Sequence, residues 1–127
     1  MEIKLFVDDM RAGPKGWVIS REITSAIRLL ATQNVVAVSL DHDIAIQKWI
    51  PNKRIKIDLM LENYTAVAWF IATMPKDIRP KTVLIHTGSI SGREYMDWIL
   101  KDKVDKLVHV YNYDNDKEEV KEAYEQV

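Results

Sequence analysis

Val35 to Leu40, with the sequence VVAVSL, is an apolar run that ends in the polar triplet Asp41-His42-Asp43. A short apolar run rich in β-branched residues predicts a strand that is buried on both faces. Such strands are typical of parallel sheets. Open parallel sheets bind ligands beyond the carboxyl ends of their strands. The triplet therefore stands where we expect a functional site.

Two further apolar runs also end in polar residues. Ile3 to Val7 ends in the pair Asp8-Asp9. Thr82 to Ile85 ends in His86-Thr87-Gly88. In a parallel sheet these strand ends would converge on one edge. The sequence thus predicts that several carboxylates and two histidines meet there, in a site suited to a metal ion and a phosphate group.

Between the strands, apolar residues recur at helical spacing. Strands that alternate with helices predict an α/β domain, with a mostly parallel central sheet in a three-layer sandwich. Only the loop after the first strand lacks a helix. The other strands are expected at Trp17–Ile19 and Leu107–Tyr111, and the helices after Ser20 or Thr24, after Asn63 or Thr65, after Ser91, and over Asp116–Val127.

Length and composition set the class of protein. The chain has 127 residues, which predicts a single domain over residues 1–127. Its net charge of −1 gives no overall field that would attract nucleic acid or membranes. It has no cysteine and no apolar run long enough to span a membrane. These features fit a complete, cytoplasmic globular protein.

Asp8, Asp9 and Asp43 are the predicted metal ligands. Adjacent carboxylates at the end of a buried strand can hold a hard divalent cation, and magnesium or manganese suits oxygen ligands. The alternative is that these aspartates only cap a helix or stabilise a turn. Asp41, at the mouth of its strand, is a ligand or a nucleophile.

His42, His86 and Asp41 are the predicted catalytic residues. Neighbouring carboxylates favour the charged form of His42, which suits a general acid. His86 could be its partner, because two imidazoles can accept and donate the protons that open or close a phosphodiester. The alternatives are a solvated turn at His42 and a structural role for His86.

Arg11, Thr87 and Ser89 are the predicted substrate-binding residues. Arg11 follows the first strand closely, and its planar guanidinium could clamp a phosphate. Thr87 and Ser89 lie before a helix start, where backbone N–H groups bind phosphate. Asp41 to Asp58 is expected to be a long polar connection, a length that is usually functional or mobile. Its basic residues weakly indicate contact with a polyanion: Lys48, Lys53, Arg54 and Lys56.

These motifs resemble the cyclic-phosphate processing receiver domain over roughly Ile3 to Tyr111. The first half matches closely, in the blocks VDDMR and SLDHD. The second half departs from the family pattern His-Ser-x-Asn-Pro-x-Gly, and a long basic insert around Pro51 replaces a short glycine-rich turn. The matching residues are Leu5 to Arg11, Pro14, Gly16, Trp17, Arg21, Ser39 to Asp43, His86, Thr87, Gly92 and Met96.

The resemblance implies a receiver-like, flavodoxin-type fold and a role in processing cyclic phosphates on nucleotides or RNA ends. In the related receivers of two-component signalling, paired acids bind magnesium and a third aspartate accepts phosphate. Asp8, Asp9 and Asp41 match that layout. The lysine expected after the last strand is missing, and His42 and His86 are additional, which favours hydrolysis or binding over a phosphorylation relay.

The leading hypothesis is therefore a metal-assisted phosphoesterase that acts on a cyclic phosphate of a nucleotide or an RNA end. A non-catalytic phosphate- or nucleotide-binding module is the second hypothesis, and a phospho-acceptor switch is the third. Homo-oligomers are possible for a domain of this kind.

Overall fold

The computed structural model describes the backbone of residues 1–50 and 55–127, and the side chains of residues 1–44 and 63–127. Five strands form a parallel sheet in the order β2-β1-β3-β6-β7. The predicted parallel sheet is thus confirmed, and the strand order is that of a receiver-like α/β fold. The strands are β1 (Glu2–Val7), β2 (Val18–Ser20), β3 (Asn34–Leu40), β6 (Thr82–Ile85) and β7 (Lys106–His109).

The register of the sheet aligns the strand ends. Val7 pairs with Leu40, and Leu40 pairs with Ile85. The next residue along each strand is therefore Asp8, Asp41 or His86, and all three stand at one edge of the sheet. This convergence follows from burial, because a shift of one residue would turn the apolar side chains of a strand to the wrong face.

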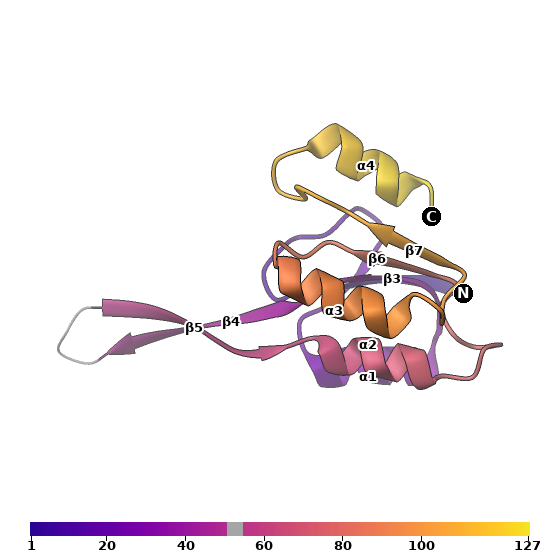
Figure 1. The fold of residues 1–127 in the computed structure, drawn as a ribbon, viewed down its shortest axis with the longest axis horizontal. Coiled ribbons are helices and arrows are strands. Elements are labelled where there is room, and N and C mark those ends of the chain that lie inside the picture. Colours follow the sequence, from indigo (N-terminus) through magenta and orange to yellow (C-terminus); the bar gives the residue numbers. More distant parts are fainter. Residues whose placement is uncertain (51–54) are drawn as a thin grey trace.

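Helices cover the two faces of the sheet unequally (Figure 1). Three helices pack on one face: α1 (Ile23–Thr32), α2 (Thr65–Thr73) and α3 (Ile90–Leu100). The other face carries α4 (Lys117–Glu125) and the loop between β1 and β2, which takes the place of a helix. The apolar core on this second face includes Phe6, Trp17, Leu84, Val120 and Tyr124.

The segment expected to be a long polar loop forms a hairpin instead. β4 (Asp43–Ile50) and β5 (Ile55–Asn63) pair antiparallel and extend away from the body of the domain (Figure 1). The sequence carries the signal for this hairpin, because the run IKIDLML from Ile55 alternates apolar and charged residues at first. The basic residues of this segment lie outside the described side chains.

Side chains cap the starts of two helices, α3 and α4. Ser89, rather than the predicted Ser91, caps α3, since its side chain accepts a hydrogen bond from the N–H of Gly92 at 3.0 Å. The last helix begins where it is predicted, and Asp116 caps it by accepting from the N–H of Glu119 at 3.2 Å. Among the described residues, no helix has the length and apolar character needed to cross a membrane.

The loop between β1 and β2 is held close to the sheet by Gly13. Its φ of +75° lies in the left-handed region, and an added Cβ would come within 2.5 Å of Cδ1 of Ile19 and 3.0 Å of Cδ1 of Phe6. Gly16 also has a positive φ, of +87°, but an added Cβ there would meet nothing within 4 Å.

We expect Gly13→Ala to destabilise the fold more than Gly16→Ala. Both variants incur about 1–2 kcal/mol of backbone strain, and overpacking adds about 1–3 kcal/mol at Gly13 alone. Urea unfolding of the two variants measures the difference. Equal losses of stability would show that the loop does not pack on the sheet as described.

Candidate functional site

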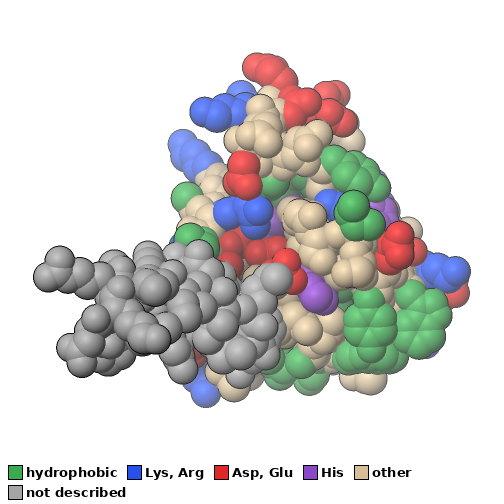
Figure 2. All heavy atoms as spheres, turned by 60° about the vertical axis from the view of Figure 1, so that its left-hand side comes forward, with side chains coloured by type: hydrophobic (Ala, Val, Ile, Leu, Met, Phe, Trp, Pro, Cys, Tyr) green, Lys and Arg blue, Asp and Glu red, His purple; other side chains and the backbone are tan. Residues whose placement is uncertain are grey.

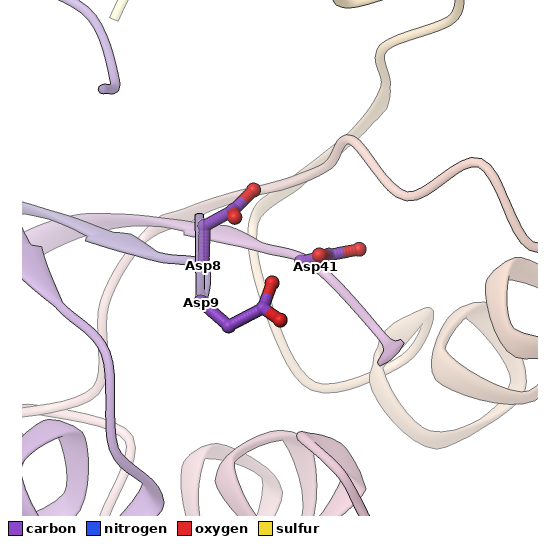
Figure 3. A group of neighbouring side chains, drawn as sticks. All are labelled: Asp8, Asp9 and Asp41. Atoms are coloured by element: carbon purple, nitrogen blue, oxygen red, sulfur yellow. The ribbon is translucent and has the colours of Figure 1, made fainter. Parts of the chain in front are cut away.

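Three carboxylates meet beyond the ends of β1 and β3 (Figure 3). Asp8, Asp9 and Asp41 each offer one oxygen atom, and these oxygens lie within 4.8 Å of one another. Asp8 and Asp41 are buried, and Asp9 is half-buried. Figure 2 shows acidic side chains gathered around a basic one on this face of the molecule. Asp8, Asp9 and Asp41 line a pocket of about 400 Å³. Its lining also includes Met10, Arg11, Asp43, Gly88 and Asp114.

Asp8 is a buried carboxylate that is completely hydrogen-bonded. Its Oδ1 accepts from the main-chain N–H groups of Met10 at 2.8 Å and Arg11 at 2.9 Å. Its Oδ2 accepts from Nη1 of Arg11 and from Nε2 of His86, both at 2.9 Å. Burial alone would raise the pKa of Asp8, but the bonds from His86 and Arg11 outweigh it and hold this pKa well below its usual range. Asp8 is therefore charged, and its four lone-pair positions are in use.

His86 lies behind Asp8, and its side chain is completely buried. Its ring stacks on Phe6 with 4.4 Å between the ring centroids. Nδ1 lies 2.7 Å from Oγ of Ser39, which in turn lies 2.6 Å from the hydroxyl of Tyr124. Burial lowers the pKa of His86, although Asp8 and Asp41 act to raise it.

These contacts assign a direction to the chain of hydrogen bonds. A neutral His86 donates from Nε2 to Asp8, so that Nδ1 accepts from Ser39, whose oxygen accepts from Tyr124. The sequence predicted that His86 lies at this edge of the sheet, and the structure places it there. The structure places it on the far side of Asp8, however, where it supports the carboxylate and does not line the pocket.

Asp41 lies at the mouth of β3, as expected. Its Oδ1 accepts from the N–H of His42 at 2.8 Å, and its Oδ2 lies 3.4 Å from Nη1 of Arg11. Burial and the negative charge of Asp8 raise the pKa of Asp41, against the opposing influence of His86 and Arg11. Asp8 and Asp41 thus have pKa values displaced in opposite directions, which is typical of functional carboxylate pairs.

Arg11 is the cation at the centre of the acidic cluster. Nη1 contacts both Asp8 and Asp41, while Nε and Nη2 donate to the two carboxylate oxygens of Asp114 at 3.0 and 3.1 Å. Burial acts to lower the pKa of Arg11, but the hydrogen bonds with Asp114 and Asp8 raise it above its usual value. Asp114 was not predicted, because it follows the last strand in an acid-rich stretch that looks like ordinary solvated surface.

His42 pairs with Asp43, which lines the acidic pocket. Nδ1 of His42 lies 2.6 Å from Oδ1 of Asp43. Gly92 leaves the space for this imidazole, since an added Cβ there would overlap the ring. Asp43 lines the pocket but is not among the three grouped carboxylates. In this arrangement it orients His42.

The side chains of Thr87 and Ser89 accept hydrogen bonds from nearby main-chain N–H groups. Oγ1 of the buried Thr87 accepts from the N–H of Ser89 at 3.1 Å, and Ser89 caps α3. Gly88, between them, lines the acidic pocket. Arg21 donates to the carbonyl oxygens of Asp8 at 3.1 Å and Arg11 at 2.7 Å and so fixes the loop that carries both.

The chain belongs to the cyclic-phosphate processing receiver domain family, whose sequence model matches residues 3–102. The match runs from β1 through α3 and includes the three grouped carboxylates and His86. Asp114 and Tyr124, which complete the site, lie beyond it. No curated protein and no solved structure matches the chain.

The grouped carboxylates suit a hard divalent cation, because their ligand atoms are oxygens that carry an excess of negative charge. Each of the three carboxylates offers one oxygen to such an ion. Asp8 could contribute only if its Oδ2 exchanged the hydrogen bond from Arg11 for the cation. Nη1 of Arg11 contacts both Asp8 and Asp41, so a bound cation would compete with the guanidinium for these carboxylates.

We expect Asp8→Asn to lower the free energy of unfolding by about 3–5 kcal/mol, because it leaves buried donors without their charged partner. Asp77→Asn, at an exposed position, is the matched control and should cost less than about 0.5 kcal/mol. Urea unfolding at pH 7 tests this difference.

The loss of stability in Asp8→Asn, relative to wild type, should shrink in acid. A carboxyl whose folded-state pKa is lowered contributes its stability above its unfolded value of about 3.9, and loses it as the pH falls through the folded-state value. A difference between Asp8→Asn and wild type that persisted unchanged from pH 7 to pH 3 would contradict this account.

Proposed function

We propose that the domain is a metal-assisted phosphoesterase that hydrolyses a cyclic phosphate on a nucleotide or an RNA end. Its family associates it with cyclic-phosphate processing. The observation that carries the proposal is the convergence of three carboxylates and the guanidinium of Arg11 in one pocket. Carboxylates that can hold a cation, beside a group that can hold phosphate, are what phosphate-ester hydrolysis requires.

Asp8, Asp9 and Asp41 would hold a Mg²⁺ or Mn²⁺ ion, which when bound polarises a phosphoryl oxygen and lowers the pKa of water. Asp41 lies at the mouth of β3 in the same pocket, where one of its oxygens could bind the cation and the other could accept the proton of the attacking water. His86 supports this work indirectly, since it fixes the orientation of Asp8.

Arg11 would bind the phosphate. Asp114 anchors the guanidinium through Nε and Nη2. Arg11 would therefore stay at the pocket if a cation replaced its contact with Asp8. The freed Nη1 would then donate to a phosphoryl oxygen. This exchange keeps the charge of Asp8 compensated both before and after a cation is bound.

His42 would protonate the leaving oxygen of the cyclic phosphate. Asp43 engages its Nδ1, which leaves Nε2 as the nitrogen that exchanges a proton with the substrate. Gly92 of α3 lies against the imidazole, and the contact with Asp43 holds the ring in one orientation.

The test is turnover of 2′,3′-cyclic nucleotides and RNA ends with Mg²⁺ or Mn²⁺, with the product identified by mass. We expect His42→Gln and Asp41→Asn each to reduce kcat about 10²- to 10⁴-fold. Asp77→Asn, at the opposite end of the sheet, should leave kcat unchanged. Full turnover in the double variant of His42 and Asp41 would refute the mechanism. A ligand that binds but is recovered unchanged would support a binding module instead.

Arg11→Gln should separate cation binding from phosphate binding. Loss of the guanidinium removes a repulsion of about 1 kcal/mol at 4 Å even in water, so Mn²⁺ should bind at least about fivefold more tightly. Inorganic phosphate should bind more weakly. Calorimetric titration measures both, with Arg28→Gln on α1 as the charge-matched control. Weaker Mn²⁺ binding in Arg11→Gln would show that Arg11 does not compete with the cation.

A further inference from the structure

A second hollow, which we call the lysine groove, lies on the face covered by α4. It has a volume of about 530 Å³ and runs between α4, the start of β1 and the loop that follows β1. Its lysines are Lys4, Lys15, Lys117 and Lys121. Nothing in the proposed chemistry of the acidic pocket uses this groove.

The groove is strongly basic, although the whole chain has a net charge of −1. Among the described residues that line it, Glu125 is the one acid, and its Oε1 lies 3.8 Å from Nζ of Lys121. Lys4 donates to the main-chain oxygen of Val127 at 2.8 Å. Lys15 and Lys117 are exposed. Because Lys117 and Lys121 are one helical turn apart, their ammonium groups lie on the same side of α4.

Aromatic side chains form the floor of the groove. Trp17 and Tyr124 are buried and meet edge to face, with 5.2 Å between their ring centroids. Tyr113 packs against Tyr124 and is half-buried, so part of its ring faces the groove. Lysines along a hollow with aromatic rings in its floor are typical of sites for single-stranded nucleic acid.

The groove and the acidic pocket share a wall. Tyr113 lines the groove, and the next residue, Asp114, lines the pocket. The guanidinium carbon of Arg11 lies 5.6 Å from the centre of the Tyr113 ring. A ligand that places a phosphate at Arg11 can therefore continue over Tyr113 into the groove.

We propose that the lysine groove binds the nucleotides that precede the terminal phosphate of a single-stranded nucleic acid. The lysines would contact successive backbone phosphates, and Tyr113 would contact a base or a sugar. This inference rests on the proposed function for the placement of the strand's end in the acidic pocket. A mononucleotide would occupy that pocket alone, so the groove distinguishes a strand from a free nucleotide.

The test separates binding in the groove from chemistry in the pocket. A labelled single-stranded RNA of about ten nucleotides, ending in a plain 3′-hydroxyl, is titrated with the protein by fluorescence anisotropy at roughly 50 to 200 mM salt. The double variant Lys15→Gln, Lys117→Gln is compared with a control that removes the same charge elsewhere, Lys76→Gln, Lys101→Gln. Circular dichroism confirms that both variants fold.

We expect the wild type and the control to bind with the same salt dependence. The groove variant should bind more weakly, and the slope of log K against log salt should fall by about 1.4, since each single-strand phosphate contact contributes about 0.7. An unchanged slope in the groove variant, or RNA binding too weak to detect in the wild type, would overturn the proposal. Tighter binding of a mononucleotide than of the RNA would also overturn it.

Turnover gives the second readout. If the groove holds the strand, kcat/KM for an RNA ending in a cyclic phosphate should exceed that for the mononucleotide, and the groove variant should lose this advantage without a change for the mononucleotide. If neither substrate turns over but the RNA binds through the two lysines, the phosphoesterase proposal fails, while the proposal that the groove binds RNA is upheld. An advantage for the RNA that survives in the groove variant would place strand recognition elsewhere.

Discussion

The charge of Asp8 is the constraint on which the site depends. A carboxylate that is completely removed from solvent costs several kcal/mol unless it is paired and hydrogen-bonded. Two main-chain N–H groups, the guanidinium of Arg11 and the imidazole of His86 supply the four bonds that meet this requirement. The loop after β1 must therefore turn sharply at Met10. That turn also brings Asp9 and Arg11 to the mouth of β3.

The same charge organises both sides of the sheet edge. Towards solvent, it raises the pKa of Asp41 and attracts a cationic group between the two carboxylates. Towards the core, it is supported by a buried chain of hydrogen bonds through His86 and Ser39 to Tyr124 of α4. α4 thus takes part in the site although it follows the segment that the family match covers. Tyr124 also lines the lysine groove, so one helix connects the pocket with the surface where we place the strand.

The hairpin β4–β5 shows how far periodicity can be read from this sequence. Pro51 and the polar residues around it predicted a loop between Asp41 and Asp58, yet the alternation from Ile55 onward was a strand signal. Strands of this kind take their stability from pairing with each other. The partner of Ile55 is Ile50, and the choice between a loop and a paired strand depends on that neighbour more than on local composition.

The sequence by itself determined the parallel sheet, its buried strands and the polar residues at their ends, because burial on both faces leaves an unmistakable apolar run. It therefore placed Asp8, Asp9, Asp41, His86 and Arg11 at one edge. Only the tertiary structure decided what each group contacts there: His86 faces the core, Asp114 completes the hold on Arg11, and Tyr124 closes the chain of bonds behind Asp8. These partners are up to 103 residues apart, and no local pattern marks such pairs, because side-chain contacts across a sheet depend on the packing of whole elements.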